Sequence, residues 1–166
     1  MENWKRGASE TMARRMLTLL LAGLLLLGWG PAAAQTTGRE ILLPDGQSVL
    51  TLPEDMVSTP VSPEESDLWA DYQRKPDLEM LIFTYRAGNS DPRKMAEALV
   101  EAGRTAEVRE IGGVEFLVFQ DRDEADGAPC VGYAFVSGET LIEIAFFYGS
   151  QEAMDRTYEI MESFHQ

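Results

Sequence analysis

The sequence predicts an α+β domain in which antiparallel β-hairpins form a sandwich with two main helices. Short apolar runs with β-type alternation are separated by turns that contain Gly or Pro. Two other segments carry apolar residues at helical spacing behind a residue that favours a helix N-terminus. The 166 residues, 45% of them hydrophobic, suffice for one domain and are too few for two.

Residues 1–34 are predicted to be a secretory signal peptide. The uncharged run Met16–Leu27 follows Arg14–Arg15 and precedes a helix-breaking segment that contains Gly and Pro. Three small residues then end at Ala34, so cleavage is expected between Ala34 and Gln35. The alternative is an uncleaved anchor, but the 12-residue run is shorter than the roughly 20 residues that span a bilayer.

Residues 35–166 are predicted to form a single domain that begins with two hairpins. The turns Pro44-Asp45-Gly46 and Lys75-Pro76-Asp77 each lie between two strand-like runs. Val57–Ser66 holds two prolines and is predicted to be a surface loop or a short helical turn. The four predicted strands are Glu40–Leu43, Ser48–Leu52, Asp67–Arg74 and Leu78–Arg86.

A helix is predicted to follow the second hairpin, from Asp91 to Gly103. Asp91 is a suitable N-cap, Pro92 fits the first helical position, and Gly103 fits the position after the last turn. The expected buried stripe consists of Met95, Leu99 and Ala102.

Two further hairpins are predicted after this helix. Gly112-Gly113 can adopt the positive φ angles of a primed turn, and Gly138-Glu139 suits a type II′ turn. The second turn sets a register in which three pairs of large side chains share one face. The four predicted strands are Thr105–Ile111, Val114–Gln120, Pro129–Ser137 and Thr140–Tyr148, and the three pairs are Phe135 with Ile142, Tyr133 with Ile144, and Val131 with Phe146.

A last helix is predicted to begin after Ser150, a good N-cap with Glu152 in the first turn. Its expected apolar stripe consists of Met154, Tyr158, Met161 and Phe164. The face of the last hairpin opposite the aromatic residues carries Gly132, Ala134 and Ala145. We expect the last helix to pack on this face, because small residues allow a close approach.

The element order and three short phrases resemble the PsbP-like fold family. The phrases are LTLPEDM at Leu50–Met56, EIGGVEF at Glu110–Phe116 and MESF at Met161–Phe164. The family includes the extrinsic PsbP subunit of photosystem II and periplasmic DcrB-type proteins of bacteria. The resemblance implies an antiparallel α/β sandwich and a non-catalytic accessory or binding role, but no site residues. The lipid-anchored Cys of some members is missing here.

The chain is strongly acidic, with 28 Asp and Glu residues against 14 Lys and Arg residues and a formal net charge of −14. The predicted signal peptide is net basic, so the domain itself is more acidic still. Such a surface repels phosphate backbones and anionic lipids, which argues against nucleic-acid binding and against a peripheral membrane role. We therefore expect a neutral or cationic protein or small-molecule partner, and membrane attachment only through an uncleaved signal.

Catalytic chemistry has little support in the sequence. The single Cys, Cys130, is predicted to be a small buried apolar residue, because a nucleophilic Cys needs a nearby base. The single His, His165, lies in the last helical turn, where frayed backbone would not hold it in catalytic geometry. G-x-S-x-G, H-E-x-x-H and a phosphate-binding Gly loop are missing. We expect no catalytic residues, no cofactor and no enzyme activity.

Spaced carboxylates in Asp121–Gly127 form the candidate metal site, with Asp121, Asp123 and Asp126 as its oxygen ligands. Counted from Asp121, the loop lacks the Gly and the final Glu of a calcium-binding loop. The favoured interpretation is a solvated hairpin tip, and no metal is expected.

Three aromatic residues of the second hairpin, Trp69, Tyr72 and Tyr85, are the candidate partner-binding residues. Exposed aromatic side chains on a rigid sheet bury much area at little entropic cost. The alternative is that they belong to the ordinary core. Two functions are compatible with the sequence: an exported, non-catalytic binding protein of the cell envelope or extracellular space, and a small extracytoplasmic hydrolase that uses carboxylates.

Overall fold

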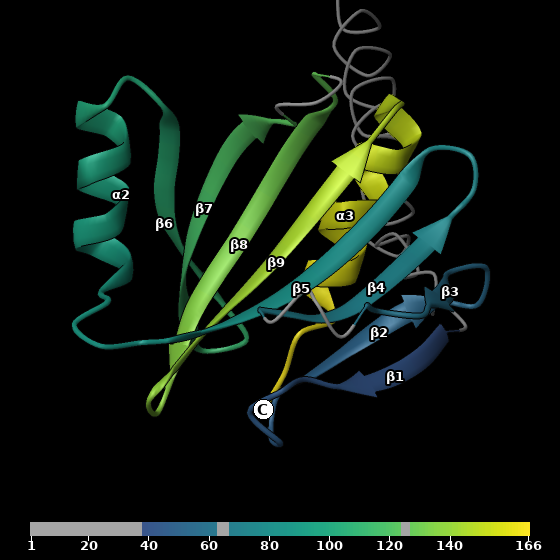
Figure 1. The fold of residues 1–166 in the computed structure, drawn as a ribbon, viewed down its shortest axis with the longest axis horizontal. Coiled ribbons are helices and arrows are strands. Elements are labelled where there is room, and N and C mark those ends of the chain that lie inside the picture. Colours follow the sequence, from purple (N-terminus) through teal and green to yellow (C-terminus); the bar gives the residue numbers. More distant parts are fainter. Residues whose placement is uncertain (1–37, 63–66, 124–126) are drawn as a thin grey trace, which may run out of the picture. The chain divides into compact units, whose positions relative to one another are not determined.

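The computed structural model describes residues 38–62, 67–123 and 127–166, which contain two antiparallel sheets and two helices (Figure 1). The predicted signal peptide and its cleavage site lie outside these residues. No helix in the described ranges is long and apolar enough to cross a membrane. The strands are β1 (Gly38–Leu42), β2 (Val49–Pro53), β3 (Val57–Thr59), β4 (Leu68–Arg74), β5 (Leu78–Arg86), β6 (Thr105–Ile111), β7 (Val114–Arg122), β8 (Pro129–Ser137) and β9 (Thr140–Tyr148), and the helices are α2 (Pro92–Glu101) and α3 (Gln151–Glu162).

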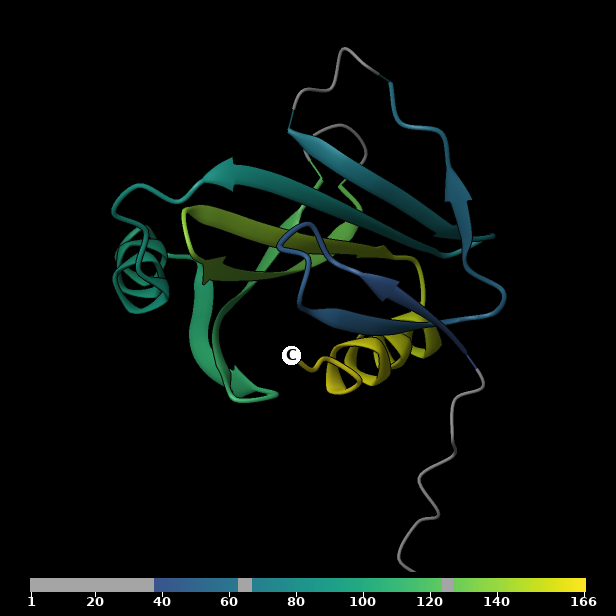
Figure 2. The ribbon, with the colours of Figure 1, turned by 90° about the horizontal axis from the view of Figure 1, so that it is seen from below.

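The larger sheet has seven strands in the order β3-β4-β5-β9-β8-β7-β6, and β1 pairs with β2 in a separate ribbon. Every pairing is antiparallel. Figure 2 shows α3 and the β1–β2 ribbon on the same side of the larger sheet, with α2 beside β6 at one end. The predicted α+β class and its antiparallel hairpins are confirmed.

The turns of the last two hairpins set the predicted registers. Gly112 and Gly113 have φ angles of 56° and 81°, which a two-residue primed turn requires. Gly138 has a φ of 59°, and no described non-Gly residue, Glu139 included, has a positive φ. All three predicted cross-strand pairs form: Phe135 with Ile142, Tyr133 with Ile144, and Val131 with Phe146.

One strand was missing from the sequence-based assignment. The segment predicted as a loop begins with β3, in which Val57, Ser58 and Thr59 pair with Gln73, Tyr72 and Asp71 of β4. The strand is too short to show an alternating pattern, and Pro60 follows it directly. Its conformation therefore depends on hydrogen bonds to β4 and not on its own side chains.

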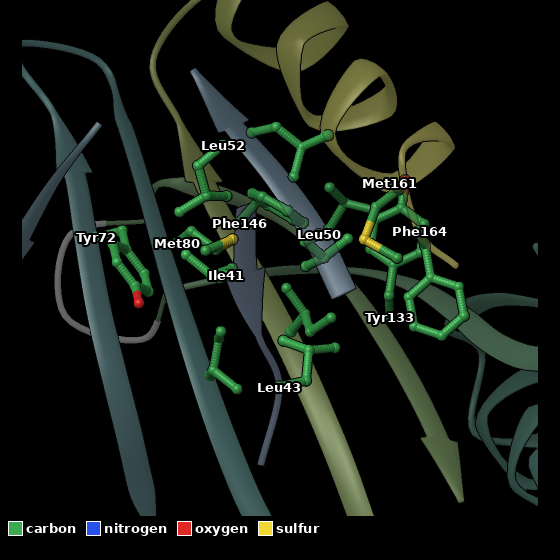
Figure 3. Close-up of a cluster of buried hydrophobic side chains, with 14 of the residues drawn as sticks. Ile41, Leu43, Leu50, Leu52, Tyr72, Met80, Tyr133, Phe146, Met161 and Phe164 are labelled. Atoms are coloured by element: carbon green, nitrogen blue, oxygen red, sulfur yellow. The ribbon is translucent and has the colours of Figure 1, made fainter. Parts of the chain in front are cut away.

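The main core lies between the larger sheet, α3 and the β1–β2 ribbon. Figure 3 shows Leu50 and Leu52 of the ribbon among side chains from the sheet and from the end of α3. Phe164 packs edge-on against Phe116 and Phe135, with ring centroids 4.9 Å and 5.4 Å apart. The inward side chains of β8 and β9 thus form the centre of the core, as the register predicts.

The prediction of which helix covers which face was wrong. Helix α3 packs on the aromatic face, and α2 packs on the small-residue face through Ala96, Leu117 and Ala134. No helix packs against Gly132, because the Phe119 ring occupies the space above it. A Cβ atom on Gly132 would lie 2.2 Å from that ring. The small residues therefore make room for a side chain of the neighbouring strand.

The buried stripes of both helices differ from the predicted ones. In α3 the buried residues are Ala153, Thr157, Ile160 and Met161, whereas Met154 and Tyr158 are only partly buried. Thr157 can be buried because its hydroxyl donates a hydrogen bond to the Met154 carbonyl over 2.8 Å. In α2 the fully buried residue is Ala96, Met95 and Leu99 are half-buried, and Ala102 is exposed. The residue of α2 that faces the sheet is thus a small one, whereas α3 contributes both small side chains and the larger Ile160 and Met161 to the core.

Candidate functional site

The three candidate aromatic residues do not share one surface. Tyr72 faces the core and is 9% exposed. Trp69 lies at an irregularity of the β4–β5 pairing and is 43% exposed. Tyr85 is half-buried and stacks on Phe83, with ring centroids 6.2 Å apart and ring planes 13° from parallel. Tyr85 and Phe83 therefore define a different face from Tyr72.

That face is the side of β5 and β9 that points away from α3 and the ribbon. We call it the open face. It is built by successive cross-strand pairs, Glu79 with Phe147, Leu81 with Ala145, Phe83 with Glu143, and Tyr85 with Leu141. Helix α2 packs against β6, β7 and β8 and reaches this surface only at Leu141. Apart from the buried Ala145, the side chains of the open face are half-buried.

Glu143 is the unusual residue of the open face. Its cross-strand neighbours are Phe83 on β5 and Ala134 on β8, neither of which can hydrogen-bond a carboxylate. Within the described part of the chain, Glu143 makes no ion pair or hydrogen bond. Loss of hydration with no compensating partner raises the pKa of the Glu143 carboxyl. Such groups cluster at functional sites.

Two weak acids whose pKa values are raised in part by the Glu143 charge remain neutral at physiological pH. Burial, and then the Glu143 and Asp67 charges, raise the pKa of Tyr85 to about 12. Burial, and then the charge of Glu143, raise the pKa of Cys130 to about 12. Neither Tyr85 nor Cys130 therefore adds a charge to the surroundings of the Glu143 carboxylate.

The structure keeps Cys130 and His165 apart. Cys130 pairs with Phe147, and its buried side chain belongs to the side of the sheet that holds the open face. The backbone of His165 pairs instead with Val49 of β2, in the ribbon that covers the other side. Because the pKa of the thiol is raised, the thiol is also protonated at neutral pH. Cys130 therefore behaves as a buried apolar residue.

A groove of about 670 Å³ opens at the end of the open face. Gln73, Glu79 and Phe147 line one part of it, and the Lys75–Pro76 turn and Pro129 line the rest. The Lys75–Pro76 peptide bond is cis. The Gln73 amide donates a hydrogen bond to Glu79 over 2.9 Å. The groove is shallow and continuous with the open face through Phe147.

The candidate metal ligands do not form a cluster in the described residues. Asp121 pairs with Arg104 and accepts a hydrogen bond from the backbone N–H of Arg122 at 2.8 Å. The Arg122 hydrogen bond, followed by the Arg104 contact, holds the pKa of the Asp121 carboxyl below its usual range. Asp126 lies outside the described residues. No group of three potential metal ligands is present in the described ranges.

Sequence reasoning missed Glu143. In an alternating strand a Glu is ordinarily read as a solvated outward residue, and only the register reveals Phe83 and Ala134 beside it. A signal was available, because the Gly138-Glu139 turn pairs Glu143 with Ala134. The sequence does not reveal which strand lies on the other side of β9.

The sequence matches no protein-family model and no curated protein, whereas solved structures share the fold. The solution structure of cyanobacterial PsbP (CyanoP) from Synechocystis is 12% identical, with a TM-score of 0.53, and the match covers 84% of this chain and 98% of that one. A crystal structure from Bacteroides thetaiotaomicron is 12% identical with a TM-score of 0.54; the match covers 77% of this chain and about half, 48%, of that protein. LpqN, involved in cell envelope biogenesis of Mycobacterium tuberculosis, is 15% identical with a TM-score of 0.49, over 80% and 86% of the two chains.

The CyanoP match extends over nearly the full length of that protein. Together with the α+β element order, it confirms the fold that the sequence resemblance implies. The chain has a PsbP-like fold.

Proposed function

We propose that this protein is an exported, non-catalytic binding protein of the cell envelope or extracellular space, and that it holds a partner protein on the open face. The PsbP-like fold supports an accessory role, because the resemblance to that family implies one. The hydrolase alternative would need a second carboxylate converging on Glu143, and the cross-strand neighbours of Glu143 are Phe83 and Ala134.

The observation that carries the proposal is the carboxylate of Glu143, which lies on an apolar surface and has no partner among the described residues. A half-buried charge with no partner lowers the stability of the folded state. Natural proteins accept local costs of this kind where a site needs them for function. Partner binding would supply the missing hydrogen-bond donor and would cover Phe83, Tyr85 and Phe147 at the same time.

Affinity capture from the cell envelope with matched variants tests this proposal. Phe83→Ala removes the central aromatic ring of the open face, and Val100→Ala removes an apolar side chain that is 53% exposed on α2. We expect wild type and Val100→Ala to recover the same partner and Phe83→Ala to lose it, with all three proteins folded by circular dichroism. Equal recovery by Phe83→Ala would remove the open face from the site.

Export is a separate part of the proposal and has its own test. N-terminal sequencing of the protein recovered outside the cytoplasm should begin at Gln35. A membrane-embedded, full-length chain as the main product would contradict cleavage.

A further inference from the structure

The open face has a one-sided distribution of charge. The outward positions of β5 are Glu79, Leu81, Phe83 and Tyr85, and those of β9 are Leu141, Glu143, Ala145 and Phe147. These eight positions hold two carboxylates and no basic side chain. A complementary surface would thus be apolar with a positive charge, and an acidic partner would be repelled.

The spacing of the open face matches that of an extended polypeptide. Phe147, Ala145 and Glu143 are alternate residues of β9, so their side chains recur about every 7 Å along the strand. An extended partner segment repeats its own side chains at the same interval. Its residues i, i+2 and i+4 can therefore face Phe147, the Leu81–Ala145 pair and the Phe83–Glu143 pair in turn.

The position of Glu143 specifies what the third of these residues should be. The carboxylate has no donor of its own in the described chain, and the stacked rings of Phe83 and Tyr85 lie beside it. An ammonium group placed there would hydrogen-bond the carboxylate and contact an aromatic ring, two interactions that favour the same cation. The groove beside Phe147 is lined by Pro76 and Pro129 together with polar residues such as Gln73 and Lys75, and its proline rings can contact an apolar side chain.

We infer that the open face binds an extended segment of a partner protein with apolar residues at i and i+2 and a lysine at i+4, the lysine ammonium pairing with Glu143. This inference rests on the proposed function and adds the chemistry of the partner. A shallow, open surface with this regular spacing suits a polypeptide better than a small molecule, which binds in an enclosing pocket.

Capped pentapeptides test the inference without knowledge of the partner. Leu-Ser-Leu-Ser-Lys presents the required pattern, Leu-Ser-Leu-Ser-Glu reverses the charge, and Leu-Ser-Leu-Lys-Ser moves lysine to the opposite side of an extended chain. Binding to the full protein is followed by NMR titration of backbone amides in β5 and β9. We expect the first peptide to bind about tenfold more tightly than either of the others.

Variants of the protein assign that preference to one carboxylate. Glu143→Gln should reduce the lysine-over-glutamate preference to about threefold or less, since the paired charge is lost. Glu110→Gln, which removes an exposed carboxylate of β6 at the far edge of the sheet, should leave the preference unchanged.

Equal binding of the three peptides would overturn the inference, and so would a lysine preference that survives Glu143→Gln. Either result is distinguishable from failure of the proposed function. If the Phe83→Ala variant still loses its partner in the capture experiment, the open face remains the site and only the chemistry assigned to the partner is wrong.

Discussion

At the scale of single residues, Glu143 should oppose folding at neutral pH. Its carboxylate is desolvated and has no partner in the described part of the chain, so Glu143→Gln should raise the free energy of unfolding by about 0.5–2 kcal/mol. Urea unfolding of both proteins at pH 8 measures the difference. A less stable Glu143→Gln variant would mean that the carboxylate has a stabilising partner.

The same substitution has a pH dependence of defined sign. The folded-state pKa of Glu143 is raised, so protonation favours the folded chain and wild type gains stability as the pH falls through that pKa. The advantage of Glu143→Gln should therefore be largest at alkaline pH, shrink as the pH falls through the raised pKa, and disappear below the ordinary Glu value of about 4.5. The neighbouring weak acids Tyr85 and Cys130 do not titrate in this range, because their pKa values are raised to about 12. An advantage independent of pH would assign the effect to side-chain packing.

Glu143 also shows where sequence reasoning ends for the site. The sequence identified the hairpin that carries Phe83 and Tyr85, because alternation and turn residues are local features. The sequence-based interpretation grouped Tyr72 with Tyr85. In the structure Tyr72 of β4 pairs with Met80 of β5, and Met80 and Tyr85 are an odd number of positions apart, so Tyr72 and Tyr85 lie on opposite faces of the sheet. The desolvation of Glu143 depends on contacts between strands separated by some 60 residues, which no local pattern contains.

At the scale of elements, the β6–β7 turn depends on Gly112 more than on Gly113. Both have positive φ angles, so alanine at either position should cost about 1–2 kcal/mol. A Cβ atom on Gly112 would also lie 2.6 Å from the backbone oxygen of Phe164, whereas Gly113 has no atom within 4 Å.

We therefore expect Gly112→Ala to be more destabilising than Gly113→Ala by about 1–2 kcal/mol, because the backbone at Phe164, just beyond α3, must shift. Thermal or urea unfolding of the two variants measures this. Equal losses would show that the turn does not contact the C-terminal segment.

The packing of the sheet also predicts how strongly two substitutions, Phe146→Ala and Trp69→Ala, lower the free energy of unfolding. Phe146 is fully buried against Tyr133, with ring centroids 5.9 Å apart, and Phe146→Ala should cost about 3–5 kcal/mol. Trp69 is 43% exposed, and Trp69→Ala should cost about 1 kcal/mol or less. Denaturant unfolding ranks the two. A larger loss for Trp69→Ala would place Trp69 in the core.

The elements also show which parts of the fold local patterns determine. Caps and turns were predictable, because Asp91 and Ser150 accept hydrogen bonds from backbone N–H groups at the starts of α2 and α3 as their positions in the sequence predict. The faces covered by the two helices were not predictable. Small residues at 132, 134 and 145 indicate available space, but only the assembled sheet shows that Phe119 fills part of it.

At the scale of the whole molecule, the fold and the charge support the same account. The PsbP-like sandwich covers one side of its larger sheet with α3 and the ribbon and leaves the open face of β5 and β9 outside both hydrophobic cores, apart from Leu141. A net charge of −14 favours association with basic partners, at a rate that falls as salt increases. The fold class and the order of helices and hairpins along the chain were predictable from the sequence, because each hairpin has its own turn residues. The partner segment that we propose was not predictable, because the open face that would bind it forms only when β5 and β9 pair in the sheet.

Site-specific photo-cross-linking in the producing cells tests the central claim, that the open face is the binding surface. A photoreactive phenylalanine analogue replaces Phe83 on the open face in one strain and the exposed Val100 on α2 in another. After irradiation, the account predicts a discrete cross-linked adduct from position 83 and none from position 100. Adducts from position 100 alone, or from neither position, would contradict it.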